Sequence, residues 1–190
     1  TQKRCRPLFR RQFRFQQWHY ERFPAHQGWV LHLVFSIDGS LIATAGQDGM
    51  VLVWSAESLE VVQRLGPFGV PVQKVSIAYD GEWIAVSMAG RVEVWSLRER
   101  RRMLRKLVRG DRTSVMAMPD GDVLMTSAEG VQKFSPSNVD SRTLFSGHEG
   151  PVWGAALDPV SPTVATFGQD RTVRFWDGRD GKSIWTMKMM

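Results

Sequence analysis

The residue types of a hydrolase triad occur twice in this sequence, at the same spacing each time. The two sets are His26, Thr44 and Asp48, and then His148, Thr166 and Asp170. A histidine that deprotonates a hydroxyl while an aspartate orients its ring is the machinery of acyl transfer. Each set is followed six residues later by a tryptophan, Trp54 or Trp176. Because a catalytic triad has no reason to be duplicated in register, we interpret both sets as structural and expect no enzyme.

Other patterns that could support chemistry are weak. Gly181-Lys182-Ser183 is similar to the end of a phosphate-binding loop, but the glycine required five positions earlier is Trp176. The four histidines are not at metal-ligand spacing, so we expect neither metal nor cofactor. Cys5 is the single cysteine, which excludes an internal disulfide framework and favours an intracellular location, in cytoplasm or nucleus. No apolar run is long enough to span a membrane.

The elements that must position these residues recur with a period of about 40 residues. Residues 26–54 and 148–176 align without a gap, and two more degenerate copies lie between them. The copies end on aromatic residues that are 41, 39 and 42 positions apart: Trp54, Trp95, Phe134 and Trp176. Within each copy, apolar runs are separated by turn signals, Asp-Gly at 38–39, 80–81 and 120–121 and Asp-Pro at 158–159. Such alternation predicts a four-stranded antiparallel meander for every copy.

One meander cannot bury both of its faces, whereas copies stacked around an axis can. We therefore predict an all-β propeller with four blades at about 23–66, 67–108, 109–146 and 147–190. An arm rich in basic and aromatic residues precedes the blades at 1–22. The fourth run of the second copy, 101–107, is predicted as a strand, and a short basic helix is the alternative there.

The repeats resemble those of the WD40 family. The last copy carries Gly147-His148, Gly168, Asp170 and Trp176-Asp177, and the first copy carries His26, Gly46, Asp48 and Trp54, with Ser55 in place of the usual aspartate. The resemblance extends over residues 26–190 and implies a propeller that binds other proteins, but it names no reaction. Because the family usually has seven blades, it also implies that this chain is a piece of a longer protein or that a second copy or another subunit completes the ring.

The resemblance further implies that each complete set is a hydrogen-bonded tetrad, in which histidine, threonine, aspartate and tryptophan brace one blade. The tetrads are His26, Thr44, Asp48 and Trp54, and His148, Thr166, Asp170 and Trp176. The second and third copies lack the histidine and the aspartate. We therefore expect those two blades to rely on packing alone and to be less rigid.

The net charge of +6 is concentrated in two segments. Residues 1–22 hold seven basic residues against one acidic, and residues 98–112 hold eight against two. Segregated charge of this kind indicates an acidic partner, which could be nucleic acid, an acidic protein surface or a charged membrane face, although a solvated loop and arm explain it equally well. The candidate contacts in the second segment are Arg98, Arg100, Arg101, Arg102, Arg105 and Lys106. For the arm we favour docking onto a protein groove, for instance as an extra strand on a neighbouring blade.

We expect this chain to be a non-catalytic scaffold within a multiprotein complex. Residues near the start of the first and last repeats are the candidate partner contacts: Gln27, Trp29, Glu149 and Trp153. Packing of the two tryptophans between blades is the equal alternative. The rival function is a ribonucleoprotein subunit that contacts RNA phosphates through the arm and residues 98–112.

Overall fold

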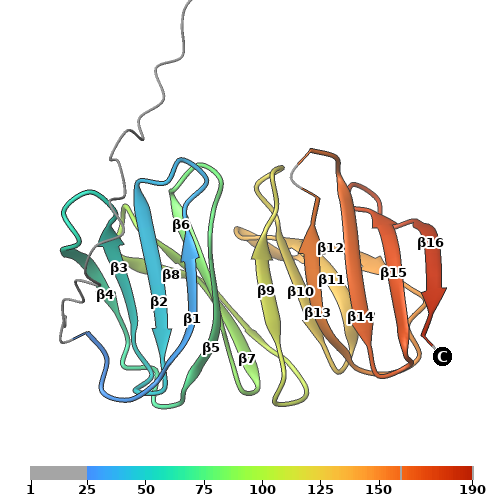
Figure 1. Ribbon diagram of the computed structural model, residues 1–190, viewed down its shortest axis with the longest axis horizontal. Helices are drawn as coiled ribbons and strands as arrows, with labels where there is room; N and C mark the ends of the chain where they lie inside the picture. Colours follow the sequence, from blue (N-terminus) through green and yellow to red (C-terminus); the bar gives the residue numbers. More distant parts are fainter. Residues whose placement is uncertain (1–24, 159, 190) are drawn as a thin grey trace, which may run out of the picture.

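In the computed structural model, which describes residues 25–158 and 160–189, all regular secondary structure is β-strand. This confirms the all-β prediction. The strands form four separate four-stranded sheets, here called blades 1 to 4 in chain order (Figure 1). Blade 1 contains β1 (Val30–Phe35), β2 (Leu41–Gly46), β3 (Val51–Ser55) and β4 (Val61–Leu65). Blade 2 contains β5 (Val72–Ile77), β6 (Trp83–Met88), β7 (Arg91–Ser96) and β8 (Arg101–Leu107).

Blades 3 and 4 repeat this antiparallel meander. Blade 3 contains β9 (Ser114–Ala117), β10 (Val123–Ser127), β11 (Gly130–Ser135) and β12 (Asn138–Phe145). Blade 4 contains β13 (Val152–Leu157), β14 (Thr163–Gly168), β15 (Thr172–Asp177) and β16 (Ser183–Lys188). The helical alternative for 101–107 is wrong, because this segment pairs along β7 and buries Leu104 against the core.

The first hairpin of every blade has the turn chemistry that its sequence predicts. Asp38 accepts a hydrogen bond from the backbone N–H two residues later, and so do Asp80, Asp120 and Asp158. An aspartate that bonds the backbone two residues on holds a tight turn closed. The glycine after three of these aspartates has φ between 71° and 87°, which a residue without Cβ adopts at no steric cost.

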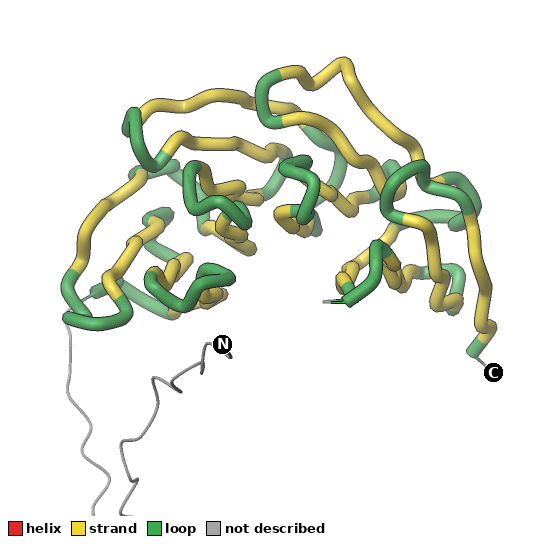
Figure 2. Tube along the Cα trace, turned by 90° about the horizontal axis from the view of Figure 1, so that it is seen from above, coloured by secondary structure: helices red, strands yellow, loops and turns green. Residues whose placement is uncertain are grey.

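The four blades follow one another along an open arc (Figure 2). One apolar cluster fills each junction between neighbouring blades, and its side chains come from both of them. Val53 of blade 1 packs with Val75 and Ile84 of blade 2, for example, while Phe145 of blade 3 packs with Trp176 of blade 4. The core is therefore a series of inter-blade layers rather than one centre.

The two ends of the arc leave apolar sheet faces exposed. Leu33 and Phe35 on β1 are 52% and 57% exposed, and Phe167 and Trp185 of blade 4 are 49% and 55% exposed. The faces differ in kind. The bare face of blade 1 is the one that carries Thr44 and Trp54, whereas in blade 4 the corresponding tetrad face is buried against blade 3. The bare face of blade 1 is the face that later blades pack against the blade before them, here called the front. The bare face of blade 4 is the face that earlier blades pack against the blade after them, here called the back.

Candidate protein-interaction surface

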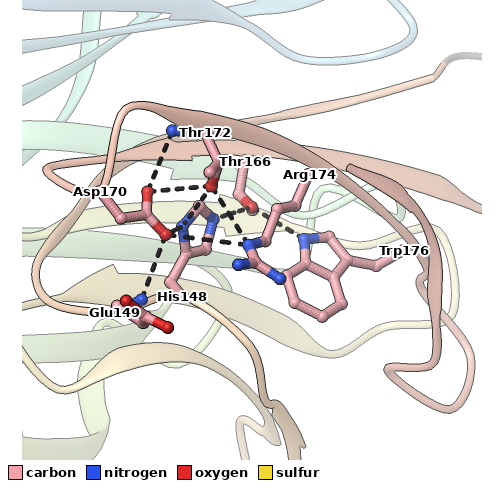
Figure 3. Close-up of polar contacts among 7 residues, drawn as sticks. All are labelled: His148, Glu149, Thr166, Asp170, Thr172, Arg174 and Trp176. Carbon is pink, nitrogen blue, oxygen red and sulfur yellow. Dashed lines mark hydrogen bonds and ion pairs between the residues drawn. The ribbon is translucent and has the colours of Figure 1, made fainter. Parts of the chain in front are cut away.

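The four residues predicted as a tetrad in blade 4 lie in one hydrogen-bonded row (Figure 3). Nδ1 of His148 is 2.9 Å from Asp170 Oδ2, and Nε2 is 2.8 Å from Thr166 Oγ1. The indole N–H of Trp176 donates to the same threonine oxygen at 2.8 Å. Trp176 is fully buried and stacks edge-on against Phe145 of blade 3. The row therefore connects the surface loop at Asp170 to the junction with blade 3.

Blade 1 holds the same arrangement. His26 Nδ1 lies 3.0 Å from Asp48 Oδ1, its Nε2 lies 2.8 Å from Thr44 Oγ1, and Trp54 Nε1 donates to that oxygen at 3.0 Å. Trp54 is only partly buried, because it belongs to the bare end face. The two tetrads thus have equal hydrogen bonds but unequal packing.

The geometry of these rows does not suit acyl transfer. A nucleophilic hydroxyl needs room for a substrate carbonyl beside it. Thr166 is 1% and Thr44 is 8% exposed, and each hydroxyl already receives an indole N–H. With every member bonded to its neighbours, the arrangement can hold two strands and a loop together, which is the chemistry that buried polar networks provide.

The carboxylate of Asp170 has a pKa that is lowered to about 2. Burial raises this pKa, but hydrogen bonds from the backbone N–H of Glu149, from His148 and from Thr172 outweigh it. In blade 1 the pKa of Asp48 is lowered for the same reasons: burial raises it, and bonds from His26 and from the backbone N–H groups of Gln27 and Met50 lower it more. Both aspartates are therefore held ionised at neutral pH.

The lowered pKa of Asp170 predicts an acid-sensitive blade. A carboxyl that is a stronger acid when folded contributes its full stability above its unfolded pKa, near 4, and loses it as pH falls through about 2. Allowing for screening by nearby solvent, we expect this contribution to be about 1 kcal/mol. The difference in unfolding free energy between the parent chain and Asp170→Asn should shrink by that amount between about pH 4 and pH 2. A difference that stays constant in urea titrations over this range would contradict the assignment.

Blade 2 has no tetrad but is not held by packing alone, so that expectation is wrong. Glu93 is 1% exposed and accepts the indole N–H of Trp95 at 3.0 Å. Three guanidinium groups surround its carboxylate: Arg105 Nε at 2.8 Å, Arg91 Nε at 3.3 Å and Arg102 Nη1 at 3.8 Å. An ionised buried group needs such partners, and here they come from β7 and β8. In the sequence, the feature that could have indicated this charge cluster is the glutamate two residues before the repeat tryptophan.

In blade 3 a buried lysine replaces the tetrad as the polar tie. Lys133 Nζ contacts Asp120 Oδ2 at 2.8 Å and donates to the carbonyl of Gly178, in blade 4, at 3.0 Å. The side chain of Lys133 is 8% exposed. The strand register places Met125 at the position of the tetrad threonine, and the buried hydroxyl of its neighbour Thr126 has no hydrogen-bond partner in the part of the chain described. The polar tie of this blade thus joins β11 to the β9–β10 turn of the same blade and also crosses to blade 4.

The basic residues predicted to contact an acidic partner have divergent surroundings. Arg102 and Arg105 are bound to Glu93, and Arg101 pairs with Glu99. Lys106 lies over the ring of Phe134, with Nζ 5.4 Å from the ring centre. Arg98 and Arg100 are exposed and have no ion pair within the described residues. Four of these six side chains therefore have partners within the protein, and the arm at 1–22 lies outside the described residues.

The loops that lead into β1 and β13 lie at the same edge of the arc, the lower one in Figure 1. Each is fastened by the tetrad aspartate: the backbone N–H of Gln27 donates to Asp48 at 2.8 Å, and that of Glu149 donates to Asp170 at 3.1 Å. Gln27 and Glu149 are exposed. Trp29 is 76% exposed in the first loop, and Trp153 is 44% exposed on β13. We call these four residues the loop edge.

Among residues 25–158 and 160–189, no group of three or more histidine, cysteine, aspartate or glutamate side chains is arranged to hold a metal ion. The same residues contain no helix that is long and apolar enough to cross a membrane.

Comparisons with known proteins agree with this geometry. The family model described as "WD domain, G-beta repeat" matches residues 18–55 and 139–177. Ribosome biogenesis protein ERB1 of Chaetomium thermophilum is 34% identical over 70 residues, which is 37% of this chain and 9% of that protein. Periodic tryptophan protein 2 homolog of Dictyostelium discoideum is 26% identical over 164 residues, 80% of this chain and 17% of that protein. The chain thus spans less than a fifth of the length of either relative.

Proposed function

Since this chain belongs to the WD40 repeat family, we propose that it is a non-catalytic scaffold that binds other proteins of a multiprotein complex. The observation that carries this proposal is the loop edge, where a tetrad aspartate fastens each loop and Trp29 stands exposed beside it. Rigid loops lose little conformational entropy on binding, and exposed tryptophans are frequent binding hot spots. The two loops of the loop edge, held by hydrogen bonds and carrying the exposed indole of Trp29, are therefore suited to binding a protein.

The names of the relatives support a more specific context. Because one relative is a ribosome biogenesis protein, we place the proposed scaffold inside the cell, in a complex that assembles ribosomes. The match covers only part of each protein, and co-purification from cells identifies the partners of this chain.

Trp29→Ala is expected to weaken partner binding about 30-fold, which corresponds to about 2 kcal/mol at a hot spot. The measurement is quantitative mass spectrometry of proteins that co-purify with the tagged chain from cells of its source. Tyr79→Ala is the matched control, since Tyr79 is 37% exposed beyond β5, at the opposite edge of the arc. If Trp29→Ala retains the same ribosome-assembly proteins as the parent chain, the loop edge is not the binding surface.

Further blades of the same kind would cover the two bare end faces. The face with Leu33 and Phe35 corresponds to the front of an internal junction, and the face with Phe167 and Trp185 corresponds to the back. Large exposed apolar faces favour association. The same purification, run with two differently tagged copies, distinguishes the sources: recovery of both tags indicates a second copy, and recovery of one tag with another repeat protein indicates another subunit.

RNA remains the alternative partner, through the exposed guanidinium groups of Arg98 and Arg100. We favour protein, because Arg102, Arg105 and Lys106 are already engaged by Glu93 and Phe134. Ribonuclease treatment before the purification separates the two: a protein scaffold keeps its partners, whereas an RNA-dependent association is lost.

A further inference from the structure

A groove of about 440 Å³ opens between blade 1 and blade 2, and none of its lining residues belongs to the loop edge. One wall is the last strand of blade 1 with its following glycine, Val61–Leu65 and Gly66, and the other wall is Trp95 and Arg100 of blade 2. We call it the rim groove. Its volume lies in the range of about 300 to 1,000 Å³ that is typical of binding pockets.

Positive charge gathers around this groove. Arg64 and Arg100 line it, and neither has a carboxylate within ion-pair distance among the described residues. Behind Trp95, the carboxylate of Glu93 is shared by three guanidinium groups and so neutralises only one of them. The uncompensated positive charge of these arginines favours an anionic ligand, because a cleft lined by charge of one sign attracts ligands of the opposite charge.

The wall formed by β4 also offers groups suited to a peptide. The side-chain Nε2 of Gln63 is buried and has no hydrogen-bond partner among the described residues. β4 is the last strand of its sheet, so its outer edge can pair with an extended chain. Val61 and Val62 supply apolar surface along the same wall, and Val62 is 49% exposed. A segment with both acidic and apolar side chains fits this combination.

The backbone at Arg100 has a left-handed conformation, with φ of 54°. Five residues after the repeat tryptophan, blade 4 has Gly181 at the equivalent place, with φ of 73°, and blade 1 has Leu59, with φ of 57°. Glycine is the residue that adopts this conformation without strain. Leu59 bears the same steric cost, so the turn itself sets this conformation, and Arg100 differs in being a basic residue that lines the groove.

We propose that the rim groove binds an extended acidic segment of a partner protein, whose carboxylates meet Arg100 inside the groove and Arg64 at the outer edge of β4. Single-stranded RNA fits less well, because base stacking needs an open aromatic face and Trp95 is partly buried, packed edge-on against Phe68 and bonded to Glu93. The rim groove is separate from the loop edge, so either proposal can fail while the other stands.

Arg100→Gly tests the proposal, because it removes the charge and relieves the backbone strain together. The probe is a fluorescein-labelled peptide of sequence Glu-Glu-Leu-Glu-Glu, and binding is followed by fluorescence anisotropy on the full chain. We expect Arg100→Gly to weaken binding about tenfold or more while leaving the urea midpoint unchanged or raised. Leu59→Gly is the matched control, since it makes the same backbone change in blade 1 without altering charge, and its affinity should stay within about twofold.

Two further probes complete the test. The neutral peptide Gln-Gln-Leu-Gln-Gln should bind at least about tenfold more weakly, and raising salt from about 50 to 200 mM should weaken the acidic peptide. The proposal is overturned if the acidic peptide shows no saturable binding up to about 1 mM, or if the two peptides bind equally. It is also overturned if Arg100→Gly and Leu59→Gly behave alike, or if oligouridylate binds more tightly than the peptide in an Arg100-dependent way.

Discussion

Replacing Glu93 by leucine is expected to lower the free energy of unfolding of blade 2 by about 3 kcal/mol, since removing one partner of a buried charge cluster leaves the others uncompensated. The carboxylate is 1% exposed, accepts hydrogen bonds from Trp95 Nε1 and Arg105 Nε, and lies within ion-pair distance of Arg91 and Arg102. The loss stays near the lower end of the range for buried pairs, because Arg91, Arg102 and Arg105 are 22%, 42% and 47% exposed and water can rehydrate them.

Hydrogen exchange of β6 and β7 is the suitable measurement for Glu93→Leu, because blades that contact only their neighbours can open one at a time. Glu93→Gln keeps one acceptor for the indole N–H and should lose less. Glu99→Gln is the matched control, since Glu99 is 53% exposed and pairs with Arg101 on the same blade; a change within about 0.5 kcal/mol is expected. A loss for Glu93→Leu no larger than that of the control would show that packing alone holds blade 2.

Thr166→Val is expected to destabilise blade 4 by about 3 kcal/mol. Valine has nearly the same shape as threonine, so no cavity forms, but two buried groups lose their partner: Nε2 of His148 and the indole N–H of Trp176. An unsatisfied buried polar group costs about 1 to 3 kcal/mol. Exchange of the amides of β14 and β15 measures the loss in the blade where it occurs.

The same substitution in blade 1 is the control for Thr166→Val. Thr44 makes the same two hydrogen bonds, yet Trp54 belongs to a bare end face, where water can reach polar groups that lose a partner. We expect Thr44→Val to cost about 1 kcal/mol. Equal losses at the two sites would mean that burial against the neighbouring blade does not set the strength of the tetrad, and no loss at either would mean that the tetrads do not brace their blades.

The repeats and the strand order could be predicted from the sequence because each depends on residue types at short, constant separations, and the resemblance to the WD40 family implied the tetrad members. Asp38 closes its turn through a backbone N–H two residues away, wherever the blade lies. His26, Thr44, Asp48 and Trp54 meet because three hairpin-connected strands place those positions together in any copy of the meander. Residue patterns that recur at a fixed period can be recognised from the sequence alone.

The polar ties of blades 2 and 3 could not be predicted in this way. Which arginines reach Glu93 depends on the register between β7 and β8, including the shift between Val94 and Trp95. Lys133 bonds the carbonyl of Gly178, 45 residues away in the next blade. Sequence spacing says little about contacts made across a junction, because these depend on how neighbouring sheets are placed.

The sequence predicts a series of four-stranded meanders, because turn residues and side-chain alternation act within a hairpin, and its resemblance to the WD40 family implied the two tetrads. The tertiary structure alone decided that the blades form an open arc with two unlike bare faces (Figure 2). It also decided which basic side chains are committed to Glu93 and which, like Arg100, remain at a groove. The physical reason is that burial and ion pairing are properties of the packed blades, and a segment's own residues do not specify what lies against it.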